Sequence, residues 1–591
     1  MADAPTEMPA QTQPVRVARP PTDGHHPEHE HLDPRRWVAL ASVMTALFMV
    51  LLDISIVNVA IPAMRQNLHA NNADIQFVVA GYGLAYAVML ITGGRLGDIF
   101  GRKRLFLIGM TGFVVASALC GLAQSAVMLD LSRVLQGLMA ALMYPQVLSV
   151  IQVSFPPHER ARVFALLGAV IGIATIAGPL VGGVIIRDDL TGGAWRWIFL
   201  VNVPIGIASL IAAIRVVTES KAPNATRLDV VGTAIATTGL LLLVYPLVQG
   251  QVLGWPTWTY VCMALSPFAL AVFVLYERRL PATAFPLVQL SMFRIRAFSV
   301  GVAISAVFIA GIPAFFFTFS LMLQVGLGFS ALHAGLTTIP WSIGSAFASV
   351  MSTRVAPRLG RYTIAIGSVI GVLGIVGIIV TLHLRGTAVT SFDLIPSFVV
   401  AGIGMGTVIA PLLTVILSGV PPRDAGSASG VLTTFQQLGG AIGVAVVGVV
   451  FFGMLSSQAA TSAANVTPQL QGQLIAAGVP PAQAQSAVAT FERCFQAQAS
   501  SSDPTQPGPG CPSVSQGSAS SQTPANAAFA RAAQAALGES FVTTERGILF
   551  FNVGFWLLTA LLSMLLPRLH HAGPRAGTTQ TPRAGTAVAA H

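Results

Sequence analysis

Residues 37–62 read WVALASVMTALFMVLLDISIVNVAIP, and Asp53 is the only charged side chain in this apolar run. A helix of about 20 such residues is long enough to cross the hydrocarbon core of a bilayer. A carboxylate placed inside that helix costs about 2.5 to 3.5 kcal/mol on insertion scales. The stretch therefore predicts a membrane-spanning helix in which Asp53 belongs to an ion or substrate pathway.

The rest of the chain has the same apolar character. Its 591 residues are 54% hydrophobic and only 9% charged, with a mean hydropathy of +0.72. Soluble domains cannot bury that much apolar surface, so we expect an all-α integral membrane protein with fourteen transmembrane helices. The spans lie near 37–60, 77–96, 104–124, 127–150, 162–186, 197–217, 228–248, 257–276, 298–322, 332–353, 362–382, 392–418, 426–453 and 547–567.

Basic residues fall mainly in alternate segments between these spans. Arg102 to Arg104 and the pair Arg278 and Arg279 face inward if the N-terminus is cytoplasmic. Positive charge near helix ends is retained on the cytoplasmic side, so both termini are expected there. The net charge of +10 then reflects topology and contact with anionic lipid headgroups, and it does not indicate nucleic acid.

One long external segment, 455–545, separates the last two spans and is rich in Ala, Gln and Ser. Short helices are expected in it around 480–497 and 524–538. Cys494 and Cys511 lie in this segment, on the oxidising face of the membrane. The sequence leaves open whether they form a disulfide.

The sequence contains an internal repeat. The spacing of Arg95, Gly101 and Arg102 recurs about 260 residues later, as does the motif that begins at Pro157. Two halves with a site between them near the midplane are typical of rocking transporters. The expected divisions are a disordered tail at 1–36, a six-helix bundle at 37–217, two extra spans with linkers at 218–297, a second bundle at 298–567 that includes the external segment, and a tail at 568–591. Four histidines in the first tail match no closed metal site.

Five motifs resemble those of the major facilitator superfamily. GRLGDIFGRKRL at 94–105 is similar to its signature loop between the second and third helices. LDISIVNVAIP at 52–62 resembles the first-helix motif of its fourteen-span drug:proton antiporter branch, the QacA/EmrB type. Three later stretches are similar to the fourth-helix, fifth-helix and sixth-helix motifs: DLSRVLQG at 130–137, the run from Gly172 to Gly183, and WRWIFLVNVPIG at 195–206. The resemblance covers residues 37–455 and the last span, and it implies two six-helix bundles plus two extra central helices.

Depth in the membrane connects Asp53 with Arg133. Helix geometry places Asp53 about 24 Å above the inner start of its span and Arg133 about 9 Å below the outer start of its own. In a core about 30 Å thick, the two can lie at a similar level. Burial disfavours the charged carboxylate and a nearby guanidinium favours it, so a movable Arg133 would switch Asp53 between holding and releasing a proton. Asp130 is a further candidate to share that proton, and a static ion pair is the alternative.

The loop after the second span is a candidate conformational latch. Its glycines permit close helix approach and a tight turn. Asp98 can pair with Arg102 or face the positive N-terminus of the helix expected to begin at 426. Ordinary anchoring by charged residues is the alternative. The candidate latch residues are Gly94, Asp98, Gly101, Arg102 and Lys103.

The fifth span carries the motif that the resemblance implies for antiporters. Gly178 and Pro179 remove a backbone hydrogen bond and thin the helix, which provides a bend and a close packing surface between the halves. Gly182 and Gly183 follow in the same motif. A merely kinked helix is the alternative, and it is compatible with transport.

The interior between the halves is expected to be aromatic and nearly uncharged. Such a surface suits bulky lipophilic or singly cationic molecules through stacking and cation–π contacts. Lipid-facing packing and hydrogen bonds between helices are the alternatives. The candidate cavity residues are Asn58, Tyr82, Tyr86, Gln136, Tyr144, Asn202, Phe316, Trp341, Gln436 and Gln437.

Together these features predict a secondary exporter of lipophilic or cationic amphipathic compounds in a bacterial cytoplasmic membrane. Its partners would be protons, a small substrate and lipid. It would need no cofactor or metal, use the proton gradient and act as a monomer. The alternatives are a dedicated exporter of one metabolite, lipid or siderophore, and a sensor or scaffold that does not transport. An enzyme is not expected, because the sequence has no P-loop, HExxH or suitably placed GxSxG motif.

Overall fold

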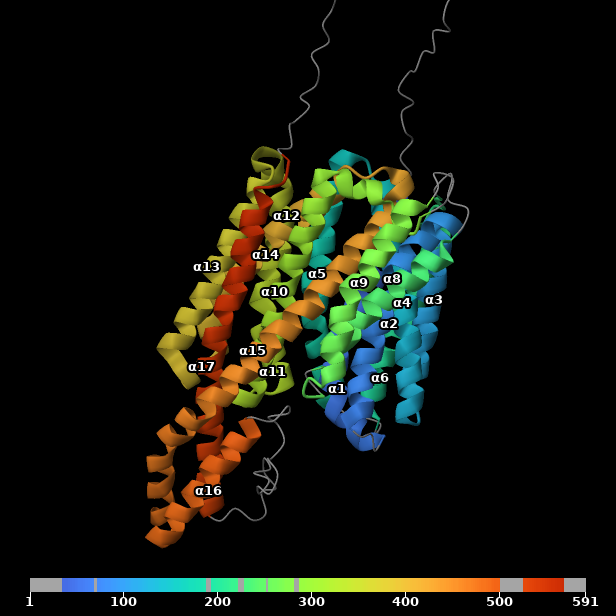
Figure 1. Ribbon diagram of the computed structural model, residues 1–591. Coiled ribbons are helices and arrows are strands. Elements are labelled where there is room, and N and C mark those ends of the chain that lie inside the picture. The colour runs from blue at the N-terminus through green and yellow to red at the C-terminus, as the bar shows by residue number, and fades with distance from the viewer. Residues whose placement is uncertain are drawn as a thin grey trace, which may run out of the picture. The chain divides into compact units, whose positions relative to one another are not determined.

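The computed structural model describes residues 34–68, 72–187, 193–221, 228–250, 253–280, 286–499 and 524–567, and every regular element within these ranges is helical. Helices are the expected solution for long apolar segments, because each backbone polar group finds its partner inside its own segment. Figure 1 shows long helices that run side by side and are joined by short connections.

The helices from the first part of the chain are α1 (Arg36–Asn67), α2 (Asn72–Phe100), α3 (Arg102–Gly121), α4 (Ala126–Ser154), α5 (Pro157–Arg187), α6 (Ala194–Leu200), α7 (Asn202–Val216), α8 (Val230–Gln249) and α9 (Thr257–Arg279). The later helices are α10 (Arg296–Leu321), α11 (Ala331–Thr337), α12 (Ile339–Leu359), α13 (Tyr362–Arg385), α14 (Ser391–Ser418), α15 (Ala425–Ala476), α16 (Pro481–Ala499) and α17 (Pro524–Ser563). Short turns occur at η1 (Leu290–Arg294), η3 (Gly386–Ala388) and η4 (Pro422–Asp424), and a π-helical turn, η2 (Met322–Gly326), directly extends α10.

Twelve stretches of the described chain are long and apolar enough to cross a membrane. They coincide with twelve of the fourteen spans expected from the sequence. The other two expected spans correspond to α5, whose side chains are described only in part, and to α11 with α12. Four serines of α12 are buried, so this helix hides polar groups inside the protein and is less apolar than its neighbours. The count of fourteen stays a prediction.

The last two long helices extend beyond the spans expected from the sequence. The span predicted to end at 453 continues to Ala476 in the 52-residue helix α15, and the helix predicted at 524–538 is the start of α17. Alanine is the strongest helix former, and α15 continues through Gly453 without a break. Only the short helix expected around 480–497 is a separate element, α16.

These extensions build a small apolar core of their own. Figure 1 shows α15 and α17 continuing beyond their neighbours, with α16 beside them. The buried residues of this extension are Ala459, Ala463, Val466, Leu470, Leu474, Ala484, Val488, Phe491, Phe495, Ala528, Ala532 and Ala536. The described residues of 455–545, predicted as a long external segment with two short helices, therefore form a packed three-helix extension.

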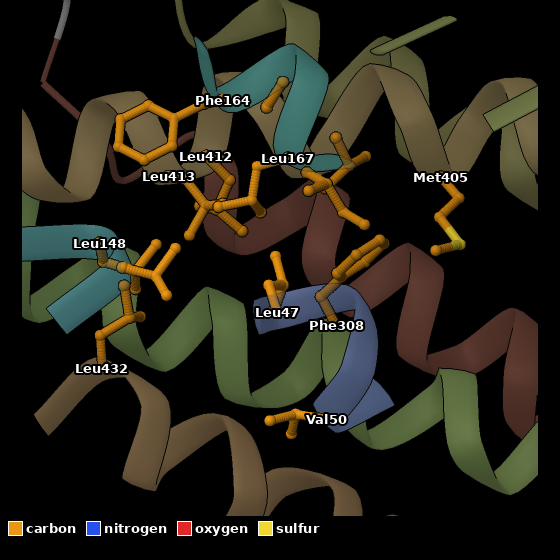
Figure 2. Packing of buried hydrophobic residues seen from close by; sticks show 14 of the residues in the cluster. Leu47, Val50, Leu148, Phe164, Leu167, Phe308, Met405, Leu412, Leu413 and Leu432 are labelled. Carbon is orange, nitrogen blue, oxygen red and sulfur yellow. The ribbon is translucent and has the colours of Figure 1, made fainter. Parts of the chain in front are cut away.

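The main apolar core joins helices from both ends of the chain. Leu47 and Val50 of α1 and Leu148 of α4 belong to the same buried cluster as Leu412 of α14 and Leu432 of α15. Figure 2 shows these side chains converging. Charged groups enclosed by such packing have no access to bulk water, so each must find its partners within the protein.

Candidate functional site

Asp53 lies in α1 with no exposed surface. One of its carboxylate oxygens, Oδ2, accepts a hydrogen bond from Arg133 Nη1 on α4 at 2.5 Å. The other, Oδ1, accepts from Gln136 Nε2 at 2.8 Å. Arg133 and Gln136 are three residues apart, so they project from the same face of α4. The structure thus places Asp53 and Arg133, which helix geometry predicted at a similar depth, in direct contact. The side-chain amide of Gln136 lies beside them.

Arg133 is held by more than this ion pair. Its Nε donates to the carbonyl oxygen of Val78 at 3.0 Å, and its Nη1 also donates to Gln136 Oε1 at 2.7 Å. Its guanidinium carbon lies 4.3 Å from the centre of the Tyr82 ring, a cation–π distance. Val78 and Tyr82 both belong to α2. Arg133 therefore connects α1 and α2 through α4.

Two more helices complete the cluster. Asn202 Nδ2 on α7 lies 3.4 Å from Asp53 Oδ1, and Gln136 Nε2 donates to Ser117 Oγ on α3 at 2.7 Å. Tyr82, Gln136 and Asn202, predicted to line the substrate cavity, lie around the acid, and their role in a cavity stays a prediction. The three groups that contact Asp53 here, on Arg133, Gln136 and Asn202, are all hydrogen-bond donors, so a proton on this carboxyl would compete with Arg133 and Gln136 for the same oxygens.

Asp130 lies one turn before Arg133 on α4 and is half-buried. The contacts define a centre made of Asp53, Arg133, Gln136 and Asn202, and the role of Asp130 stays a prediction.

The loop after α2 joins two helices that are far apart in sequence. Asp98 is fully buried and accepts hydrogen bonds from Arg102 Nη2 at 2.8 Å and from the backbone nitrogens of Gly426 and Ser427 at 3.1 and 2.9 Å. The last two are free N–H groups at the start of α15, where the helix dipole favours a negative charge. Arg102 also donates to the carbonyl of Pro422 at 2.8 Å. Both contacts suggested by the sequence are present together.

Two glycines of this loop are required by its geometry. A Cβ on Gly94 would come within 2.3 Å of the Gly426 carbonyl oxygen, so α2 and α15 touch through their backbones. Gly101 has φ +111°, a conformation that favours glycine. Its equivalent in the repeat, Gly360, also has a positive φ, at +54°.

The N-terminal end of α3 is bonded to the end of α7 and the segment after it. Glu219 accepts from the backbone nitrogens of Lys103 and Arg104 at 3.1 and 3.2 Å. Lys103 Nζ donates to the carbonyl of Ile214 at 2.8 Å. Sequence reasoning missed Glu219, because it lies in a linker about 115 residues away from the motif that it caps.

The fifth-helix motif lies against α1. A Cβ on Gly178 would come within 1.9 Å of Ser55 Oγ and 2.9 Å of the Ile56 nitrogen, only two residues beyond Asp53. Gly183 faces Leu332 of α11, and Gly182 is buried. The side chain of Pro179 lies outside the described residues. The motif therefore holds α5 directly against the helix that carries the acid.

The remaining cavity candidates separate into two groups. Tyr86 lies 6.1 Å from Tyr144, ring centre to ring centre, and forms a side-chain hydrogen bond with Gln437 of α15. Trp341 packs against Phe316 and donates to Met405 Sδ, deep among aromatic rings of the second half. Gln436 donates to Ser305 of α10 instead. The side chain of Asn58 lies outside the described residues.

Two buried acids were missed by sequence reasoning. Glu545 of α17 has no exposed surface, and Glu277 of α9 is nearly as buried. Each directly precedes an arginine near the end of an expected span. Both acids were therefore placed at span boundaries. The predicted Cys494–Cys511 pairing involves Cys511, which lies outside the described residues, so it stays a prediction.

The sequence model of the Major Facilitator Superfamily matches residues 43–444. The "Probable actinorhodin transporter" of Streptomyces coelicolor is 39% identical over 570 residues, covering 94% of this chain and 97% of that protein. The "Tetracenomycin C resistance and export protein" of Streptomyces glaucescens is 35% identical, covering 74% and 78%. The solved structure of the human organic anion transporter MFSD10 has a similar fold, with a TM-score of 0.52 and 15% identity over 71% of this chain and 94% of that one.

Proposed function

The chain belongs to the major facilitator superfamily and is similar to antibiotic exporters, and from this premise we propose that it exports lipophilic or cationic amphipathic compounds in exchange for protons. It is a membrane transporter, and we assign it no catalytic reaction and no cofactor. The proton gradient supplies the energy.

The single observation that carries the proton coupling is the buried contact between Asp53 and Arg133 at 2.5 Å. A buried ion pair is costly to form and more costly to break by removing one partner, so its presence in a membrane protein suggests a function. When a proton binds Asp53, the carboxyl no longer needs the charge of Arg133. Arg133 is then released from α1 but keeps its contacts with Val78 and Tyr82 of α2.

Helix α2 supplies the connection from the acid to the latch loop. Tyr82 and Asp98 lie 16 residues apart on this helix, which corresponds to about 24 Å. A movement of α2 caused by the release of Arg133 therefore reaches the contact between Asp98 and the start of α15. We propose that this contact breaks when the transporter opens at that end and re-forms when the end closes.

Two adjoining features support a lipophilic or cationic substrate. Tyr86 and Tyr144 provide aromatic surface next to α15, where Tyr86 meets Gln437. Asp53 is the nearby acid, and it would bind either a proton or a cationic substrate but not both at once. The relatives named for actinorhodin and tetracenomycin C support antibiotics as the substrate class.

In this proposal, the two six-helix bundles expected from the sequence are the parts that move. Residues 37–217 and 298–567 would rock against each other, with 218–297 as the extra helices. The distribution of basic residues supports cytoplasmic termini in a bacterial plasma membrane, with the monomer as the working unit.

A dedicated exporter of one compound is the second candidate. The similarity to the probable actinorhodin transporter extends over 94% of this chain, which includes the long external segment as well as the bundles. Similarity in a segment outside the transport core favours a shared specific role.

The decisive experiment measures ethidium accumulation in inverted membrane vesicles driven by a proton gradient. We expect the wild type to accumulate the dye and Asp53→Asn to lose gradient-driven accumulation, because the amide cannot bind and release a proton. The matched control is Asp393→Asn, which alters an acid bonded to Arg385 at the end of α14. It should transport like the wild type.

Two outcomes would change the proposal. Equal accumulation by the wild type and Asp53→Asn would remove Asp53 from the coupling step. A folded wild type that does not move ethidium would favour the dedicated exporter. Size-exclusion profiles and melting temperatures of the purified variants establish that each is folded.

A further inference from the structure

Glu545 is a second acid buried within a membrane helix, and the exchange between Asp53 and Arg133 does not use it. Its side chain has no exposed surface. Oε1 accepts a hydrogen bond from the hydroxyl of Thr318 on α10 at 3.2 Å. Oε2 is buried and has no hydrogen-bond partner within the described structure. Half of this carboxyl is therefore unsatisfied, which natural proteins rarely allow without a role.

The neighbouring helices bring no charge to Glu545. Helices α10, α13 and α15 and the turns η2 and η3 pack against α17. Helix α15 and both turns contain no titratable residue, and α10 contains only Arg296 at its far end. His383 and Arg385 of α13 are exposed, and Arg385 pairs with Asp393.

The charged residues of α17 itself do not pair with Glu545. Arg531 and Glu539 lie in the extension, and Glu539 accepts from Asn465. Arg546 follows Glu545 directly, and consecutive helical residues project about 100° apart. No ion pair involves Glu545 among the described residues. A carboxyl buried without a cation is held in its neutral, protonated form.

The internal repeat relates this contact to the first site. Thr318 follows Asp53 by about 260 residues, the same offset as the repeated motifs. Asp53 of α1 contacts Asn202 at the start of α7, and Thr318 of α10 contacts Glu545 of α17. Each half therefore joins its first and last helices through one acid and one neutral partner. In the first half the acid lies on the first helix, and in the second half it lies on the last helix.

Polar groups along the same helix offer the acid a route for protons. Asn552 and Thr559 follow Glu545 at intervals of seven residues and so lie on nearly the same face of α17, all fully buried. Both polar atoms of the Asn552 side chain lack hydrogen-bond partners, as does the Thr544 hydroxyl. The π-helical turn η2 begins four residues after Thr318, and such turns are common at functional sites.

We propose that Glu545 is a second proton-carrying carboxyl, and this inference rests on the proposed proton-coupled export. Water donates a proton to the carboxylate, and the neutral acid is held against Thr318. When α10 moves relative to α17 and water reaches the carboxyl, the proton returns to water on the other side. Only the O–H bond forms and breaks. One transport cycle then carries a proton on Asp53 and another on Glu545.

The first test reads protonation directly, without a substrate. Infrared difference spectra of the full-length protein in liposomes are recorded as the pH is raised from neutral. We expect a protonated-carboxyl band in the wild type that is absent in Glu545→Gln and retained in Glu539→Gln, the matched change on the same helix. Thr318→Val keeps the acid but removes its hydrogen bond, so the band should shift in frequency. A band unaffected by both Glu545→Gln and Thr318→Val overturns the inference.

The second test counts protons. Proteoliposomes report proton flux with a pH-sensitive dye and ethidium flux by fluorescence, and Glu545→Gln should move one proton fewer per ethidium than the wild type or Glu539→Gln. An unchanged ratio overturns the inference. If Asp53→Asn loses coupling while Glu545→Gln keeps the wild-type ratio, the proposed function stands and only this inference fails. If Asp53→Asn couples normally, the proposed function fails, and the infrared band still decides the state of Glu545.

Discussion

At the scale of single residues, Arg133 explains why α1, α2 and α4 meet at one point. Its planar guanidinium has donors in several fixed directions, and it uses them on Asp53, Gln136 and the Val78 carbonyl. Its flat face also covers the Tyr82 ring. A lysine carries the same charge but cannot reproduce this fork. The site therefore depends on the shape of the cation as well as its charge.

Gly178→Ala is predicted to loosen the helix that carries Asp53. The added methyl would meet Ser55 Oγ at 1.9 Å and the Ile56 nitrogen at 2.9 Å, so α5 must move away from α1. Overpacking of this kind costs about 1–3 kcal/mol, and we expect a lower melting temperature and weaker proton-driven transport. Adding Ser55→Ala removes the nearer atom and should restore part of the stability.

The control for this change is Gly554→Ala on α17, where a Cβ meets nothing within 4 Å. Alanine favours a helix over glycine by up to about 1 kcal/mol, so this variant should be equally stable or more stable. Equal melting temperatures for Gly178→Ala and Gly554→Ala would contradict the close contact between α1 and α5.

The sequence could predict which residues lie at the same depth in the membrane. The helical rise fixes height along a span, so the contact between Asp53 and Arg133 could be expected from their distances to the span ends. Height does not give the direction in which a side chain points. For that reason the contacts of Tyr82, Gln136 and Asn202 with the central pair could not be predicted, and their place in a cavity stays a prediction.

At the scale of elements, α2 makes two contacts at different heights along its length. Its N-terminal part bonds to Arg133 through Val78, and its C-terminal part touches α15 through Gly94 and Asp98. A hydrogen-bonded helix transmits displacement along its length better than a loop does. Coupling between the two contacts is therefore expected to depend on the continuity of α2.

Asp98→Asn is predicted to open the contact between α2 and α15. The carboxylate accepts from two free N–H groups at the start of α15, and an acid there contributes about 0.3–2 kcal/mol. The readout is disulfide formation between cysteines at 149 and 429, because Ser149 Oγ and Ser429 Oγ lie 3.3 Å apart across α4 and α15. In a background without native cysteines, Asp98→Asn should slow this cross-link several-fold.

Asp229→Asn is the control, because Asp229 also caps a helix but bonds to Gly232 of α8 and Tyr276 of α9, away from the cross-linked positions. It should leave the cross-linking rate unchanged. A rate unaffected by Asp98→Asn would show that the contact with α15 does not depend on this carboxylate.

At the scale of the whole molecule, the membrane-spanning helices were predictable and the extension was not. Apolar runs of spanning length are read directly from composition, because lipid enforces helices there. The extension is stabilised instead by helices that are apolar on one face only, where residues such as Ala459 and Leu470 pack together. Its Ala, Gln and Ser content resembles that of an irregular segment unless the three helices are seen together.

Phe491→Ala is predicted to open the extension selectively. Phe491 belongs to the buried cluster of the extension, which is separate from the main core. Removing a buried phenylalanine typically costs about 3–5 kcal/mol, so trypsin should cleave faster at Arg493 in α16. Asp53-dependent transport should persist. The control is Phe551→Ala, a change at an exposed position of α17. Equal cleavage of the two variants would contradict a packed extension.

Helix α15 begins at the Asp98 contact and ends in the extension. At 1.5 Å per residue, its 52 residues would measure about 78 Å, more than twice the thickness of the hydrocarbon core. A small rotation of such a helix at the Asp98 contact produces a large displacement at its C-terminal end in the extension. An antibody fragment bound to the extension is therefore expected to restrain the Asp98 contact, far from its own epitope.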